Sequence, residues 1–216
     1  MGMNWSSLLS VRLTRKWGLF TRRTGVIIAV ILWIPAVGVG VGALFRYSNT
    51  PGRLAAPPQD WPQSAGFGRV PGESTLVVFA HPQCPCSRAT IGELALIVAH
   101  CRVKVNTYVL FYAPRSMGED WARSELWNDA AAIPGVHVLE DQDGREVRRF
   151  GASTSGQTLL YGIDGQLVFN GGITAARGHL GANDGTDAVE SMLKYGIAKQ
   201  PTAPVFGCSL LGLGDG

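Results

Sequence analysis

A strand, two cysteines and a helix follow one another directly in this chain of 216 residues. Residues Ser74–Ala80 are apolar or β-favouring without polar alternation, which is typical of a strand covered on both faces. Cys84, Pro85 and Cys86 follow, and proline is favoured in the first turn of a helix such as the one predicted over 87–100. The start of a helix presents unpaired N–H groups and a positive dipole end, which both favour thiolate over thiol. The run therefore predicts thiol chemistry or the binding of a soft metal.

An uncharged apolar stretch over residues 25–45 predicts a transmembrane helix. About 20 apolar residues are needed for a helix to cross a bilayer. Basic residues precede the stretch and no acidic residue occurs before Asp60, which predicts a cytoplasmic location for residues 1–24. A cleaved signal peptide is the alternative, but its apolar core usually has only about 7–15 residues. The sequence therefore favours a single-pass protein of the inner membrane, with its C-terminal domain in the periplasm.

The charge of the chain reflects this topology. The formal net charge is +3 at pH 7, but acidic residues outnumber basic ones from Arg69 onward. The basic surplus therefore lies near the apolar stretch, and no nucleic-acid partner is predicted. All four cysteines lie in the part predicted to be exported, where disulfides are permitted.

The rest of the chain is predicted to form a proline-containing linker over 46–68, a folded domain over 69–199 and a tail over 200–216 that carries Cys208. Strands that alternate with helices indicate a mainly parallel sheet, to which a hairpin at Asp164-Gly165 adds an antiparallel edge. Apolar patterning and turn residues predict strands at 74–80, 103–112, 136–140, 157–163 and 166–170, helices at 87–100, 120–133 and 187–195, and a short helix or turn at 143–150.

This order of elements, with a thiol motif between the first strand and its helix, resembles the thioredoxin-like fold over residues 70–198. Three runs, at 81–88 (HPQCPCSR), 171–179 (GGITAARGH) and 204–208 (PVFGC), resemble the RedB-type membrane-anchored thioredoxin-like proteins of bacteria. The resemblance implies an α/β domain, with a central mixed sheet flanked by helices, behind one transmembrane helix. It also implies an extracytoplasmic role in thiol–disulfide exchange.

The chain departs from the thioredoxin pattern in ways that concern the site. Only Pro85 separates its two cysteines, and in an alignment with the family Cys86 takes the place of the second, buried cysteine. Gln157 stands where the family has a cis-proline beside the disulfide, so we expect its side chain near the thiols. Val77 or Val78 replaces the buried acid of the first active-site strand. These departures suggest a specialised couple with a dedicated partner rather than a general disulfide reductase.

The predicted function is that of a membrane-anchored thiol–disulfide oxidoreductase with a Cys-Pro-Cys site, no cofactor and an unidentified redox partner protein in the periplasm. Cys84 is expected to react with a partner's sulfur and Cys86 to resolve the mixed disulfide. Arg88 and His81 are expected to add positive charge beside the thiolates. A bond between Cys84 and Cys86 would be strained, because the single-residue spacer makes disulfide geometry hard to reach.

Several alternatives remain open from the sequence. A distant cysteine, Cys101 or Cys208, is an alternative resolving residue, although Cys101 is expected to be a buried structural side chain. The tail that carries Cys208 is either mobile or docked beside the turn that carries Cys84 and Cys86. Cys84, Cys86 and His81, with or without Cys208, could instead bind Cu(I) in a copper-delivery module. A non-catalytic adaptor on the same scaffold is a third possibility.

Overall fold

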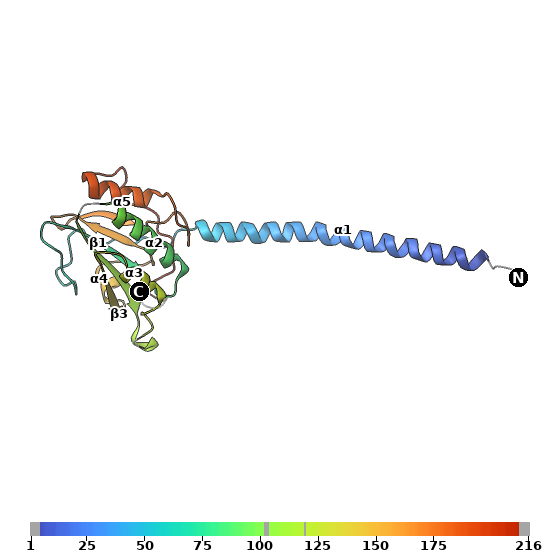
Figure 1. Cartoon of the computed structure of the whole chain (residues 1–216), viewed down its shortest axis with the longest axis horizontal. Coiled ribbons are helices and arrows are strands. Elements are labelled where there is room, and N and C mark those ends of the chain that lie inside the picture. The colour runs from blue at the N-terminus through green and yellow to red at the C-terminus, as the bar shows by residue number, and fades with distance from the viewer. Residues whose placement is uncertain (1–4, 102–103, 119, 212–216) are drawn as a thin grey trace. The chain divides into compact units, whose positions relative to one another are not determined.

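The computed structural model describes residues 5–101, 104–118 and 120–211, and it separates into an N-terminal helix and a domain that begins at Ser48 (Figure 1). The helix, α1, spans Trp5–Asn49 and contains Pro35. Over Thr24–Asn49 its hydropathy is 2.5, and by length and composition this helix could cross a membrane. The predicted span over 25–45 therefore lies within a longer helix.

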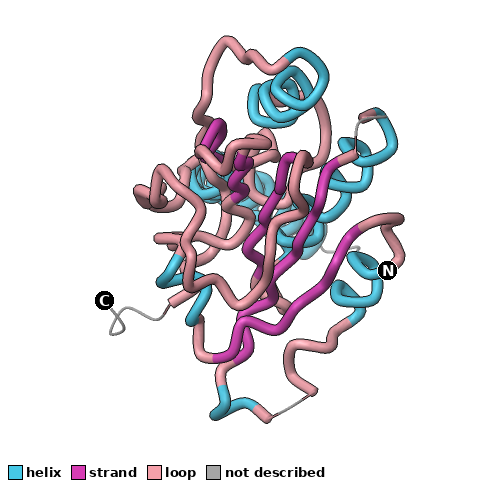
Figure 2. Tube along the Cα trace, turned by 90° about the vertical axis from the view of Figure 1, so that its left-hand side faces the viewer, coloured by secondary structure: helices cyan, strands magenta, loops and turns pink. Residues whose placement is uncertain are grey.

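A five-stranded mixed sheet in the order β3-β2-β1-β4-β5 forms the centre of the domain, and its strands are drawn in magenta in Figure 2. Strands β1, β2 and β3 are parallel, whereas β4 is antiparallel to β1 and β5 is antiparallel to β4. This is the predicted thioredoxin-like fold, so the predicted fold class is confirmed. The strands are β1 Ser74–Ala80, β2 Val105–Ala113, β3 Val136–Gln142, β4 Thr158–Tyr161 and β5 Leu167–Gly171, and the helices are α2 Pro85–His100, α3 Glu125–Ala131, α4 Arg145–Arg149 and α5 Asp184–Tyr195, with a 3-10 turn at Arg115–Met117.

The two faces of β1 belong to different hydrophobic cores. Leu76, Val78 and Ala80 pack in a core shared with residues of α2, α3 and α5. Val77 and Phe79 pack in a second core on the opposite face, to which α4 contributes. Because successive strand residues point to opposite faces, burial on both sides explains why β1 is apolar throughout. The same burial gives a rigid support to the turn at the carboxyl end of β1, residues 81–84, which is called the active turn below.

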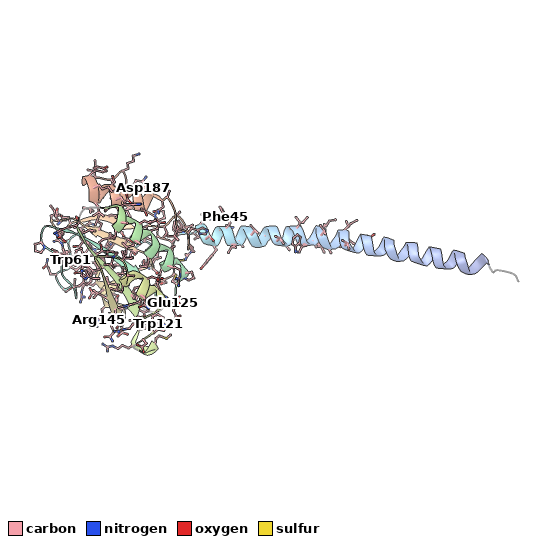
Figure 3. All side chains as sticks on the ribbon, in the orientation of Figure 1. Phe45, Trp61, Trp121, Glu125, Arg145 and Asp187 are labelled. Carbon is pink, nitrogen blue, oxygen red and sulfur yellow. The ribbon has the colours of Figure 1, made fainter. Side chains whose placement is uncertain are left out.

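The segment predicted to be a linker packs against the second core. Trp61, which is labelled in Figure 3, is only 9% exposed. Its ring centroid lies 5.1 Å from that of Phe150 and 5.2 Å from that of Tyr161. The hydroxyl of Tyr161 donates a 3.1 Å hydrogen bond to the carbonyl of Pro58. Since α4 has only 5 residues, it cannot cover this face alone. Residues 50–68 are therefore part of the fold, and the domain begins earlier than predicted.

The helix predicted over 120–133 is shorter in the structure. A turn in which the N–H of Arg123 donates to Asp120 precedes α3, and α3 starts only after the extended residue Ser124 (φ −76°, ψ 177°). The hydroxyl of Ser124 donates a 3.1 Å hydrogen bond to the carbonyl of Pro82. This contact ties the start of α3 to the turn that carries the cysteines. Residue 103 of the predicted second strand lies outside the described residues.

Candidate active site

Cys84 occupies the N-cap position of α2, at the end of a tight turn that leaves β1. The turn is closed by a 3.1 Å bond from the N–H of Cys84 to the carbonyl of His81. Two buried serines stabilise the turn. The N–H of His81 donates a 2.9 Å hydrogen bond to the hydroxyl of Ser155, and that hydroxyl lies 2.6 Å from the hydroxyl of Ser87. Pro85 takes the first helical position, where no N–H is required. The geometry thus fixes the thiol of Cys84 at the positive end of α2.

The partner of Cys84 in the structure is Cys208, whose Sγ lies 3.3 Å from the Sγ of Cys84. The tail that carries Cys208 is docked, which decides between the two alternatives left open by the sequence. Val205 and Leu210 are 1% and 2% exposed and anchor the tail on either side of the cysteine. The tail therefore holds a second thiol beside the start of α2.

Backbone contacts fix the tail against the segment that precedes β4. The N–H of Ser155 donates to the carbonyl of Cys208 over 2.8 Å, and the N–H of Leu210 donates to the carbonyl of Ser153 over 3.0 Å. Thr154 and Ser209 form an antiparallel bridge between them. Residues 208–210 are therefore paired like a short extra strand, and this pairing sets the position of the Cys208 side chain.

Arg177, in the loop between β5 and α5, connects the tail to the third cysteine of the site. Its Nη1 atom donates a hydrogen bond to the carbonyl of Gly207, and its guanidinium also interacts with the buried thiol of Cys86. The loop is in turn tied to α2, because the buried carboxylate of Glu93 accepts a 2.6 Å hydrogen bond from the N–H of Gly181. Arg177 was not singled out from the sequence, although it lies in the quoted run at 171–179.

Hydrogen bonding gives the three thiols different acidities. Burial raises the pKa of Cys84, but the contact with the Cys208 side chain and nearby backbone N–H groups outweigh it, so that the pKa lies below the ordinary 9.0. Burial and the adjacent Cys84 raise the pKa of Cys208 to about 11. Burial and the charge of Cys84 also raise the pKa of Cys86, against the opposing effect of Arg177. Cys84 is therefore the thiol of the cluster that ionises most readily, and its Sγ atom is hydrogen-bonded to that of Cys208.

These acidities predict two separate ionisations of the reduced protein. As the pH rises, Cys84 should lose its proton first, with a midpoint below pH 9.0, whereas Cys208 should stay protonated until about pH 11. The variant Cys208→Ala loses the hydrogen-bond donor but keeps Cys84 buried, so the pKa of Cys84 should rise. The ultraviolet absorbance of thiolate against pH measures both midpoints, and Cys101→Ala serves as the control. An unchanged first midpoint in Cys208→Ala would show that Cys208 does not stabilise the thiolate.

His81 and Arg88 were predicted to add positive charge beside the thiolates, but in the structure both are engaged elsewhere. Burial lowers the pKa of His81, so its neutral form is favoured, and its ring packs edge-on against Trp121 at 5.2 Å between centroids. Arg88 is exposed and pairs with Asp129 at 3.4 Å and Glu125 at 3.6 Å. The charge that acts on the thiol cluster comes instead from Arg177.

Gln157 is buried but does not face the cysteines as expected. Its Oε1 atom accepts a 3.0 Å hydrogen bond from the N–H of Ser153, and its Nε2 atom donates over 2.9 Å to Asn170. Ser155, two residues earlier, is the residue of this segment that contacts both the active turn and the tail. No peptide bond in the described residues is cis.

A groove of about 290 Å³ opens beside Cys84, on the side of α3. It is lined by Pro82, Gln83, Cys84, Pro85, Arg88, Ser124, Glu125 and Leu126. Within the described residues, no group of three or more His, Cys, Asp or Glu side chains is arranged to hold a metal ion. Cys101 caps the other end of α2, so it does not belong to this site.

Comparisons with known proteins give structural relatives only. No family model and no curated protein matches the sequence. The chain is similar to a hypothetical protein from Sinorhizobium meliloti (19% identity, TM-score 0.54, 74% of this chain and 93% of that one). It is also similar to an uncharacterized conserved protein from Geobacillus kaustophilus (14% identity, TM-score 0.54, 76% and 92%). A secreted disulfide oxidoreductase from Mycobacterium tuberculosis matches with a TM-score of 0.41 (16% identity, 57% and 81%). The first two share the fold of this domain.

Proposed function

We propose that this protein is a thiol–disulfide oxidoreductase whose reactive couple is Cys84 and Cys208. The observation that carries the proposal is the 3.3 Å separation of the two Sγ atoms. Cys84 lies at the start of a helix and its pKa is lowered, which increases its thiolate fraction, and thiolate is the form that undergoes disulfide exchange. In this reaction the couple exchanges two electrons and two protons with a dithiol or disulfide of a partner.

This proposal changes the role predicted for Cys86. Cys86 lies within the first turn of α2, is 7% exposed and has a raised pKa. It therefore remains a protonated thiol beside the reactive sulfur, whereas Cys208 is the thiol held by hydrogen bonding against Cys84. The predicted Cys84–Cys86 bond would also have to overcome the constraint that Pro85 imposes on the backbone.

We also propose that α1 anchors the domain to the inner membrane, with the domain in the periplasm and a redox partner protein there. The apolar segment over Thr24–Asn49 and the basic residues that precede it support this topology. An oxidising compartment would allow the couple to cycle. The resemblance of three runs to RedB-type proteins supports the same location.

The copper-delivery alternative has less support from the arrangement of the side chains. The predicted ligand set was Cys84, Cys86 and His81, but the Nδ1 atom of His81 accepts a 3.3 Å hydrogen bond from the N–H of Gln83. The ring of His81 also stacks beside Tyr112 at 6.3 Å between centroids. A redox couple uses only the two thiols that the structure brings together.

A redox titration of the full-length protein in detergent tests the proposed couple. After equilibration in glutathione buffers, free thiols are alkylated and the protein is digested with trypsin, which places Cys84 and Cys86 in peptide 70–88 and Cys208 in peptide 200–216. We expect the oxidised protein to yield these two peptides joined by a disulfide. A disulfide confined to peptide 70–88, or reduced thiols in every buffer, would contradict the proposal.

A further inference from the structure

We propose that Cys208, not Cys84, is the sulfur that a partner's thiolate attacks, so that the tail carries the mixed disulfide. This inference rests on the proposed Cys84–Cys208 couple and names the order of its steps. The protein then acts as the acceptor of two electrons from a partner dithiol. The role usual for a cysteine at the start of the helix passes to a residue 124 positions away in the chain.

Accessibility provides the first argument. Cys84 is only 5% exposed, whereas Cys208 is exposed as a residue, although its thiol is partly buried against Cys84. The segment at 153–155 holds the tail through the carbonyl of Cys208, the N–H of Leu210 and the Thr154–Ser209 bridge, which are all backbone contacts. The sulfur of Cys208 can therefore exchange partners while the backbone of the tail remains docked. A thiolate that attacked Cys84 instead would have to enter through the groove beside Cys84.

The stability of the leaving group provides the second argument. In thiol–disulfide exchange, the sulfur whose thiolate is better stabilised leaves faster. Attack on Cys208 expels Cys84, which lies at the N-cap of α2, where the positive end of the helix stabilises a thiolate. Attack on Cys84 would instead expel Cys208, which lies in the tail after α5 and not at the start of a helix. Both arguments select the same sulfur.

The step balances with a partner dithiol as the reductant. One partner thiolate attacks the Sγ of Cys208, the bond between Cys84 and Cys208 breaks, and its electron pair leaves on Cys84. The second partner thiolate then attacks the partner's own sulfur in the mixed disulfide, which releases an oxidised partner and the thiolate of Cys208. Cys208 takes up a proton, and this restores the reduced pair whose Sγ atoms lie 3.3 Å apart in the structure.

Mapping of the mixed disulfide tests the order of steps in the full-length protein. The oxidised protein is treated briefly with reduced glutathione, quenched with acid, alkylated and digested with trypsin. We expect glutathione on peptide 200–216 in about tenfold or greater excess over peptide 70–88, with an alkylated thiol on the latter. Cys86→Ser removes the ambiguity within peptide 70–88, and Cys101→Ser is the matched control.

The outcomes separate this inference from the proposed function. Glutathione found mainly on peptide 70–88, although the starting protein contained the joined peptides, would overturn the order of steps and leave the couple intact. Absence of joined peptides in the starting protein would overturn the couple, and the inference with it.

Discussion

The variant Cys208→Ala should lose the intramolecular disulfide and turn over a dithiol peptide about a hundredfold more slowly or worse. The reason is that a tethered thiol held 3.3 Å from its partner reacts at a high effective concentration. Without it, Cys84 should accumulate as a stable mixed disulfide with glutathione. The measurements are the rate of peptide oxidation in a glutathione buffer and the mass of peptide 70–88.

Two matched variants control this experiment. Cys101→Ala removes a buried thiol outside the site and should leave the rate unchanged. Cys86→Ala should keep the joined peptides 70–88 and 200–216, because Cys84 and Cys208 both remain. If instead Cys86→Ala lost the disulfide while Cys208→Ala kept it, the Cys-Pro-Cys pair would be the reactive couple and the tail would be a structural element.

The variant Gly207→Ala should uncouple the tail from the active turn without touching a thiol. A Cβ atom at Gly207 would lie 1.8 Å from the carbonyl oxygen of Ser155, so backbone must move. Overpacking of this kind typically costs about 1–3 kcal/mol, which corresponds to a weakening of tail docking by about 5- to 150-fold. The equilibrium constant for disulfide formation against glutathione should fall by the same factor.

The matched control is Gly68→Ala, since nothing lies within 4 Å of a Cβ atom at that position. It should leave both the disulfide equilibrium and the thermal midpoint unchanged. The ultraviolet pH titration of Gly207→Ala provides a second readout, because displacement of Cys208 should raise the pKa of Cys84. A wild-type disulfide equilibrium in Gly207→Ala would show that the docked tail does not set the reactivity of Cys84.

The sequence predicted the elements that depend on local patterns. The continuous apolar run predicted β1 with its observed bounds, because burial on both faces removes polar alternation. The cysteines and Pro85 predicted the start of α2, since the N-terminal turn of a helix has clear residue preferences. The prolines of residues 46–68 suggested a linker, but Trp61 from this segment packs in the second core.

What the sequence by itself determined is that a thiol lies at the start of a helix behind a buried strand, because those features depend on neighbours in the chain. Only the tertiary structure decided which group faces that thiol. Cys208 reaches Cys84 because the tail pairs with residues 153–155, and Arg177 reaches Cys86 and Gly207 because its loop is tied to α2 through Glu93. These contacts join residues far apart in the chain, so no local sequence pattern could predict them. For this reason the contacts predicted for Gln157, Arg88 and His81 are made instead by Ser155, Arg177 and the tail.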